Sequence, residues 1–149
     1  MPWVAGNVLT AAQLNTYAPQ SWSAYTPAMT QWTLGNGTLT GRTAQHGKTV
    51  HFSLRLTIGS TTSSGGSGIM TLSLPVAAEM GSSTTAFPPI GWASLRDVSA
   101  PAQRQWMACL NSTSTFLMAD DSLTPVQGTT PWTWATGDLI VVNGSYEAA

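Results

Sequence analysis

Charged side chains are scarce in this sequence. Asp, Glu, Lys and Arg make up 7% of the residues, whereas soluble domains usually contain about 25%. Ser, Thr, Gly, Asn and Gln supply the polarity instead, and a neutral, hydroxyl-rich surface suits a protein held in an assembly or outside a cell better than a free monomer. Because the few basic residues are scattered along the chain, the sequence predicts no phosphate-binding patch and no nucleic-acid partner. These basic residues are Arg42, Lys48, Arg55, Arg96 and Arg104.

Cysteines and long apolar runs are lacking as well. The single Cys109 permits no internal disulfide, and its apolar neighbours predict a small buried side chain. A chain of 149 residues suits one domain that needs no disulfide or metal for stability. No apolar run approaches the about 18 residues of a membrane span, and residues 1–6 lack the basic and apolar regions of a signal peptide. We therefore expect no membrane partner, and release by cell lysis rather than by secretion.

Patterns that carry catalysis or bind metals are also missing. Among the six acidic residues, only Asp120 and Asp121 are adjacent, and neighbouring strand residues point to opposite faces. We interpret this pair as a polar turn, not as a glycosidase dyad or a calcium site. The two histidines, His46 and His51, have no third ligand at a spacing typical of zinc sites. No nucleophile elbow or phosphate-binding loop is present, so the sequence predicts a protein that is not an enzyme and has no cofactor or metal.

Alternation of apolar and polar residues dominates the chain from Ser23 onward. Between residues 48 and 58 every second side chain from Val50 to Ile58 is apolar, which predicts a strand buried on one face. Asn36-Gly37 predicts a hairpin turn. Residues 60–68 predict a flexible loop, and the prolines within residues 86–90 predict an edge or the start of a strand. Further strands are predicted over Ile69–Leu74, Ile90–Val98, Gln103–Leu110, Ser114–Met118 and Leu139–Tyr146.

Seven or eight short strands separated by Gly- and Pro-rich turns predict an all-β domain over residues 23–149. The expected architecture is an antiparallel β-sandwich, jelly-roll-like. Residues 1–22 differ: Thr10 and Gln13 have the spacing of a capping box, which predicts a short helix from Ala11 to about Tyr17, ending before Pro19. Such a helix is too short to be stable alone in water, so we expect this segment to dock on another surface. Its candidate docking residues are Trp3, Leu9, Leu14, Tyr17 and Trp22.

Four tryptophans in the second half of the chain allow different roles. Trp132 and Trp134 are two residues apart and project the same way if the backbone is extended. They would then stack on a sugar ring, or they would cover the open end of a barrel before the last strand, which we favour. Trp92 and Trp106 lie within predicted strands, so we expect them in the core or in an interface.

The run Trp3-Val-Ala-Gly-Asn-Val-Leu-Thr-Ala-Ala-Gln-Leu-Asn-Thr16 and residues 32–42, 47–52 and 131–146 carry a resemblance to a known family. They resemble segments of the small virion structural proteins of actinobacterial tailed bacteriophages, of the minor tail and capsid decoration type. The first run is similar to the N-terminal signature of these proteins, although Asn7 replaces the usual acidic residue and Pro19 shortens the helix that follows. Residues 59–130 have no such likeness.

The resemblance implies a structural protein on the outer surface of the virion, without catalytic residues. It implies a homotrimer whose partners are other virion proteins, such as major capsid or tail proteins. It does not separate a capsid from a tail location, and the lack of a shaft or coiled coil leads us to favour capsid decoration. One alternative is a receptor-binding module that recognises host cell-surface glycan through Trp132 and Trp134. The least favoured alternative is a wall-degrading hydrolase.

Overall fold

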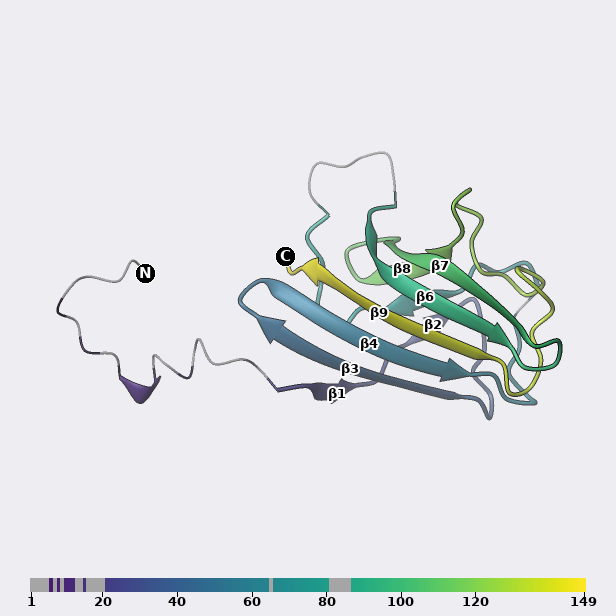
Figure 1. The fold of residues 1–149 in the computed structure, drawn as a ribbon, viewed down its shortest axis with the longest axis horizontal. Coiled ribbons are helices and arrows are strands. Elements are labelled where there is room, and N and C mark those ends of the chain that lie inside the picture. The colour runs from purple at the N-terminus through teal and green to yellow at the C-terminus, as the bar shows by residue number, and fades with distance from the viewer. Residues whose placement is uncertain are drawn as a thin grey trace.

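The computed structural model describes residues 6, 8, 10–12, 15, 21–64, 66–80 and 87–149, and the elements that these residues form are nine strands (Figure 1). All strand pairs are antiparallel and join one sheet with the order β1-β3-β4-β9-β6-β7-β8-β5-β2. The predicted all-β class is therefore confirmed. The strands are β1 (Ser23–Tyr25), β2 (Met29–Thr30), β3 (Thr38–His46), β4 (Thr49–Thr57), β5 (Thr71–Ser73), β6 (Pro89–Asp97), β7 (Ala102–Leu110), β8 (Thr115–Ala119) and β9 (Leu139–Glu147).

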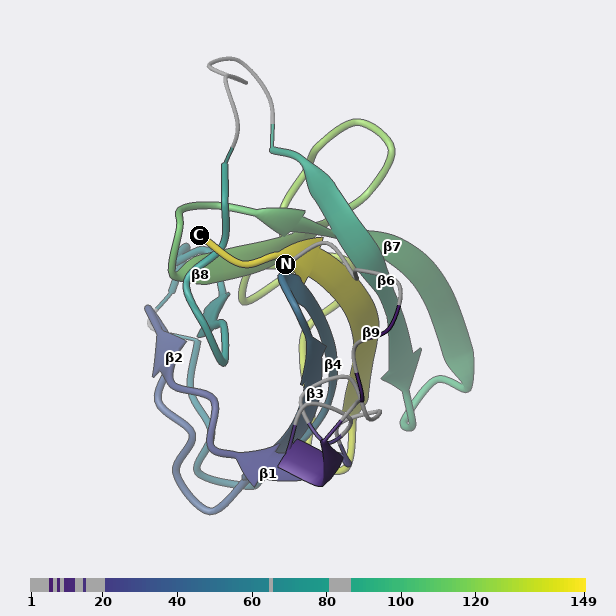
Figure 2. The same ribbon diagram turned by 90° about the vertical axis from the view of Figure 1, so that its left-hand side faces the viewer.

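The sheet curls into a half-barrel around its apolar core (Figure 2). Phe52 on β4 contacts Phe116 on β8, with ring centroids 5.3 Å apart, although three strands separate β4 from β8 in the sheet order. One continuous sheet thus supplies both sides of the core. A sandwich of two separate sheets, of jelly-roll type, is not confirmed.

Strand β4 has the one-sided burial that its alternation predicts. Val50, Phe52, Leu54 and Leu56 are at most 2% exposed, and the side chains between them are exposed or half-buried. Burial of each such apolar side chain contributes about 1.5–3 kcal/mol to stability. These side chains fix the side of β4 that faces the core, and the intervening ones point outward.

The hairpin predicted at Asn36-Gly37 is wrong. A turn does form there, with the Gly37 N–H donating to the Leu34 carbonyl at 3.0 Å, but it leads into β3 and does not join two paired strands. Its Asn36 side chain binds a loop instead, since Asn36 Oδ1 accepts from the backbone N–H of Thr61 at 2.9 Å. The two-residue hairpin is at Gly47-Lys48, between β3 and β4, where glycine tolerates the positive φ of 57°.

The structure describes few residues of the predicted N-terminal segment. Strand β1 begins at Ser23, the first residue after that segment, and the division of the chain after Trp22 stays a prediction. The named elements are all strands, but the described residues Ala11, Ala12 and Asn15 have α-helical backbone (Figure 1). They fall within the helix predicted from Ala11 to about Tyr17, whose other residues lie outside the described ones, so the extent of that helix stays a prediction. The described part of the chain contains no helix with the length and apolarity needed to span a membrane.

The edge strand β1 is held on β3 by Tyr25. The Tyr25 ring packs over Gly41, where a Cβ atom would lie 2.5 Å from a ring carbon, so glycine is needed at this position for the close approach. Burial raises the pKa of the Tyr25 hydroxyl. Tyr25 thus packs against Gly41 from the core side of β3. Thr40 and Arg42, the residues on either side of Gly41, point outward.

Candidate functional site

The outward side of β3, β4, β9, β6 and β7, here called the convex face, carries the exposed side chains of these strands. Strand register places one row of residues across it, each directly opposite the next. Successive strands lie about 4.8 Å apart, so the row extends over about 19 Å. Its members are Arg42, Ser53, Asn143, Trp92 and Met107.

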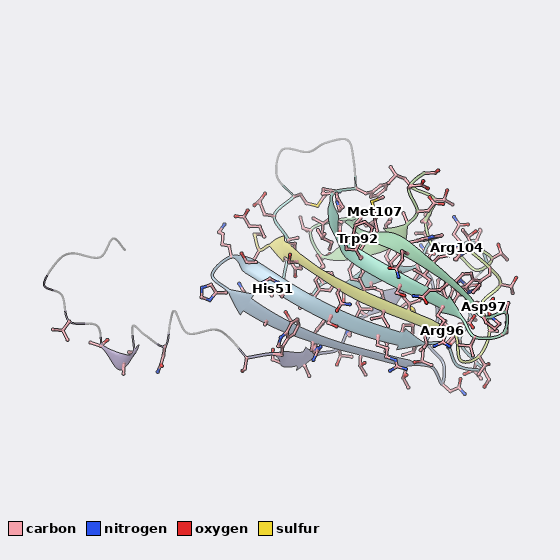
Figure 3. All side chains as sticks on the ribbon, in the orientation of Figure 1. His51, Trp92, Arg96, Asp97, Arg104 and Met107 are labelled. Carbon is pink, nitrogen blue, oxygen red and sulfur yellow. The ribbon has the colours of Figure 1, made fainter. Side chains whose placement is uncertain are left out.

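Trp92 is the large side chain that stands out from the convex face. It is 66% exposed, and Figure 3 shows it beside Met107 on the neighbouring strand. Met107 packs in turn against a small buried apolar cluster on the same side of β7 and β8, formed by Cys109, Leu117 and Ala119. Trp92 and Met107 therefore form an apolar patch on a face that is otherwise largely polar. This pair makes the convex face a candidate contact surface.

A β-bulge directs Trp92 outward. The pairing of β6 with β7 shifts register between Pro89 and Gly91, so Ile90 and Ala93 both face the core although three positions separate them. Gly91 lies so close to β9 that a Cβ atom there would be 2.2 Å from the Asn143 carbonyl oxygen. A bulge adds one residue and reverses the side on which later residues lie. Of our two expectations for Trp92, the core of its own domain is excluded.

Two arginines line a hollow on the convex face. Arg42 lies opposite Ser53 and Thr40 lies opposite Arg55, which makes the two arginines diagonal neighbours on one face. The hollow has a volume of about 420 Å³. Arg42 is oriented by Trp22, since its Cζ lies 4.9 Å from the indole centroid. The hollow is lined by Thr40, Gly41, Arg42, Ser53, Leu54, Arg55 and Val141.

No ion pair within 4.0 Å joins an acidic residue to Arg42 or Arg55 in the described part of the chain. Asp97 and Asp138 are buried and accept hydrogen bonds from backbone N–H groups at the turns that follow β6 and precede β9. Glu147 lies 4.0 Å from Lys48 in an exposed ion pair at one end of the sheet. Asp120 Oδ1 accepts from the N–H groups of Ser122 and Thr124, so the predicted polar turn at Asp120-Asp121 is confirmed. No cluster of three His, Cys, Asp or Glu side chains occurs in the described part of the chain.

A second hollow lies at the free end of β7. It has a volume of about 530 Å³ and contains both acids of the Asp120-Asp121 turn together with Arg104. No ion pair within 4.0 Å joins Arg104 to either acid in the residues that the structure describes. Trp106 also lines this hollow, and it belongs to the core at 6% exposure, as we expected for this tryptophan.

The tryptophans predicted as a possible sugar platform are packed against the core. Trp132 and Trp134 are half-buried and contact each other with ring centroids 5.4 Å apart. Trp134 also packs edge-on against Trp32 at 6.1 Å, and its Nε1–H donates to the Gln127 carbonyl at 3.0 Å. This geometry favours our expectation that they cover the end of the sheet. Their contact with glycan stays a prediction.

The structure describes one of the five predicted docking residues, Trp22. Trp3, Leu9, Leu14 and Tyr17 lie outside the described residues, so their role stays a prediction. Trp22 is 49% exposed and lies against Arg42, next to the hollow on the convex face.

The remaining candidates for reactive chemistry have ordinary surroundings. His51 is exposed on the convex face at one end of β4 (Figure 3), and His46 is exposed at the end of β3. Cys109 is buried, as predicted, and burial raises the pKa of its thiol, which keeps it protonated and unreactive at neutral pH.

Sequence reasoning missed the two features that define the convex face. The diagonal pairing of Arg42 with Arg55 depends on strand register, and the outward direction of Trp92 depends on the bulge. A single signal was present for each: Gly91 within a strand, which is typical of bulges, and the Gly47-Lys48 turn, which sets the register of β3 against β4. Comparison with protein-family models, with curated proteins and with solved structures found no match to the chain.

Proposed function

We propose that this chain is a non-catalytic structural protein of the bacteriophage virion surface, a homotrimer that decorates the capsid. The N-terminal likeness in residues 3–16 supports the virion role. The apolar patch of Trp92 and Met107 carries the proposal of assembly, because exposed aromatic residues are typical anchors of subunit contacts. We favour the capsid over the tail because the sequence contains no stretch that predicts a shaft or coiled coil.

In this proposal the apolar patch is the centre of the subunit contact. A cyclic trimer requires each subunit to present two different surfaces that fit each other, and the patch of one subunit would contact another surface of the next. The uncharged residues beside the patch support such a contact, because they lose no charge hydration when they are covered. These residues are Asn143, Ser94 and Gln105. We also propose that the two arms of the curl act as the layers of a jelly-roll-like sandwich, which the contact between Phe52 and Phe116 supports.

Residues 1–22 are the proposed docking segment onto capsid or tail proteins. No core residue among those described precedes Tyr25, so removal of the segment is expected to leave the β-domain folded. Trp22 contacts Arg42 at the start of the sheet, and the docked partner would therefore lie near β1 and β3.

The test compares the intact chain with two variants. Mass photometry of the intact chain should give about three times the mass of one subunit. Trp92→Ala should dissociate the trimer, while Val98→Ala, which removes a 46% exposed apolar side chain away from the patch, should not. A chain without residues 1–22 should keep its circular dichroism spectrum but fail to join virions. A monomeric intact chain at micromolar concentration contradicts the trimer, and normal incorporation of the truncated chain contradicts docking through residues 1–22.

A second candidate function is the recognition of host cell-surface glycan. The observation in its favour is the hollow between Arg42 and Arg55, which is exposed and lined by hydroxyl groups. The hollow is lined by residues of β3, β4 and β9, and Trp92 lies on β6, the next strand after β9 in the sheet order. Because Trp92 does not line the hollow, glycan binding and trimer formation would use different side chains of the convex face. Binding of labelled protein to host cells, lost in Arg55→Gln and kept in Trp134→Phe, would support this function, and equal binding by both variants would count against it.

A further inference from the structure

We infer that the hollow between Arg42 and Arg55 binds an acidic sugar residue of a glycan, with the two guanidinium groups holding its carboxylate or phosphate. This inference rests on the second candidate function, glycan recognition. It adds to that function the charge of the ligand and the residues that contact it. The hollow is lined by residues of β3, β4 and β9 alone, so a single subunit contains the whole hollow.

The two guanidinium groups lack a counter-charge. All six acidic residues of the chain are described, and Glu147 is the acid that lies on the outward side of these strands. Glu147 is opposite Thr49, six residues along β4 from Arg55, which corresponds to about 20 Å. That distance exceeds the screening length of about 8 Å at physiological salt. Like charges that are close across two strands destabilise the sheet, and an anion bound between them removes this repulsion.

The hydroxyl groups beside the arginines are available to a ligand. Thr40 and Ser53 both line the hollow, and Thr40 is exposed while Ser53 is half-buried. Arg42 keeps its N–H edges accessible because Trp22 contacts the guanidinium group through its ring, with Cζ 4.9 Å from the centroid. Guanidinium groups bind carboxylate and phosphate oxygens in pairs of parallel hydrogen bonds, and hydroxyl groups bind the neighbouring hydroxyls of a sugar.

The size and charge of the hollow favour a glycan over a nucleic acid. A volume of about 420 Å³ is at the small end of ligand sites, so it holds one unit of a polymer. Nucleic acids are bound through many phosphate contacts, typically about 6–10, whereas this hollow offers two cations and the whole chain has a net charge of −1. Val141 provides an apolar floor between the polar groups, which suits the C–H face of a sugar ring.

The test measures binding of the intact chain to four probes by isothermal titration calorimetry. The probes are an oligogalacturonate, a glycerol phosphate oligomer, uncharged maltohexaose and a thymidine oligonucleotide. We expect the two anionic oligomers with glycan-type backbones to bind, more weakly as salt is raised from about 0.05 to about 0.5 M. Arg42→Gln and Arg55→Gln should each weaken that binding at least about tenfold, as loss of a charge-assisted hydrogen bond predicts.

Arg96→Gln is the matched control. Arg96 is exposed on the same face (Figure 3) and lies two strands from β4 in the sheet order, so the variant removes the same charge outside the hollow and should change affinity less than about twofold. Equal weakening by Arg55→Gln and Arg96→Gln overturns the site in favour of a diffuse positive face. Equal or tighter binding of the oligonucleotide overturns the glycan in favour of nucleic acid. Binding of maltohexaose as tight as that of the acidic oligomers leaves glycan recognition standing but overturns the anion. No binding of any acidic probe overturns the inference.

Discussion

Phe52 on β4 and Phe116 on β8 contact each other across the interior of the curled sheet, with ring centroids 5.3 Å apart and planes inclined by 52°. Both side chains are at most 1% exposed. Since the two strands are not neighbours in the sheet, this contact joins the two arms of the curl, and Tyr146 extends it with a ring 5.9 Å from that of Phe52.

Truncation of this contact should destabilise the whole domain. Phe116→Ala removes a fully buried ring and is expected to lower the free energy of unfolding by about 3–5 kcal/mol. Phe87→Ala is the matched control, because Phe87 is 41% exposed and its loss should cost about 0.5 kcal/mol or less. Urea unfolding followed by tryptophan fluorescence measures both, and equal midpoints would show that the two arms do not depend on this contact.

Asp138 joins the start of β9 to the turn after β6. Its carboxylate is fully buried and accepts from the N–H of Val98 at 2.9 Å and from that of Ala135 at 2.8 Å. Asp138→Ala leaves two donors without an acceptor, at about 1–3 kcal/mol each, so we expect a loss of about 2–6 kcal/mol in unfolding free energy. Asp121→Ala, in an exposed turn, should unfold like the wild type. A similar stability of the two variants would contradict this role.

Asp97 should make stability depend on acid pH. The Ser99 hydroxyl, followed by the backbone N–H of Ala100, donates to its carboxylate and lowers the pKa of Asp97 below its ordinary value of 3.8. A group with a lowered folded pKa contributes stability above the unfolded pKa and loses it as the pH falls through the folded pKa. Wild type should therefore exceed Asp97→Asn in urea midpoint at pH 7, and the difference should shrink between about pH 5 and pH 2. A constant difference would contradict this.

Two tryptophans should respond in opposite ways to truncation. Trp134 is half-buried against Trp32 and donates a hydrogen bond to Gln127, so Trp134→Ala should cost about 2–3 kcal/mol, below the value for a fully buried ring. Trp92 is 66% exposed, and Trp92→Ala should change the stability of one subunit by about 0.5 kcal/mol or less. Thermal melting, at a protein concentration low enough that the trimer has dissociated into single subunits, measures both effects. A large loss of stability in Trp92→Ala, without one in Trp134→Ala, would contradict the assignment of Trp134 to the packed interior and of Trp92 to the surface.

The long strands could be predicted because alternation is a local property of the sequence. The strand predicted over Gln103–Leu110 is observed as Ala102–Leu110, and that predicted over Leu139–Tyr146 as Leu139–Glu147. The short edge strands β1 and β2 could not be predicted, since three and two residues carry no periodicity and are defined by their partners. The curl of one sheet, in place of a two-sheet sandwich, likewise depends on packing between distant strands.

The candidate site was less predictable than the fold. The alternation of β6 placed Trp92 among core or interface residues, and the bulge at Gly91 excludes the first of these. Arg42 and Arg55 are thirteen positions apart in the sequence, and only the register of β3 with β4 makes them neighbours. Trp132 and Trp134 were recognised as a pair, but their packing against Trp32 depends on a contact about one hundred residues away.

Quantitative mass spectrometry of virions tests the central claim most directly. Particles of the virus that encodes this chain would be purified by density gradient, and the chain counted against the major capsid protein. We predict that the chain is a stoichiometric component present in a multiple of three copies, as a homotrimer on a symmetric particle requires, and that it is lost from particles when residues 1–22 are deleted. A chain that stays in the soluble lysate and is absent from purified particles would contradict the account.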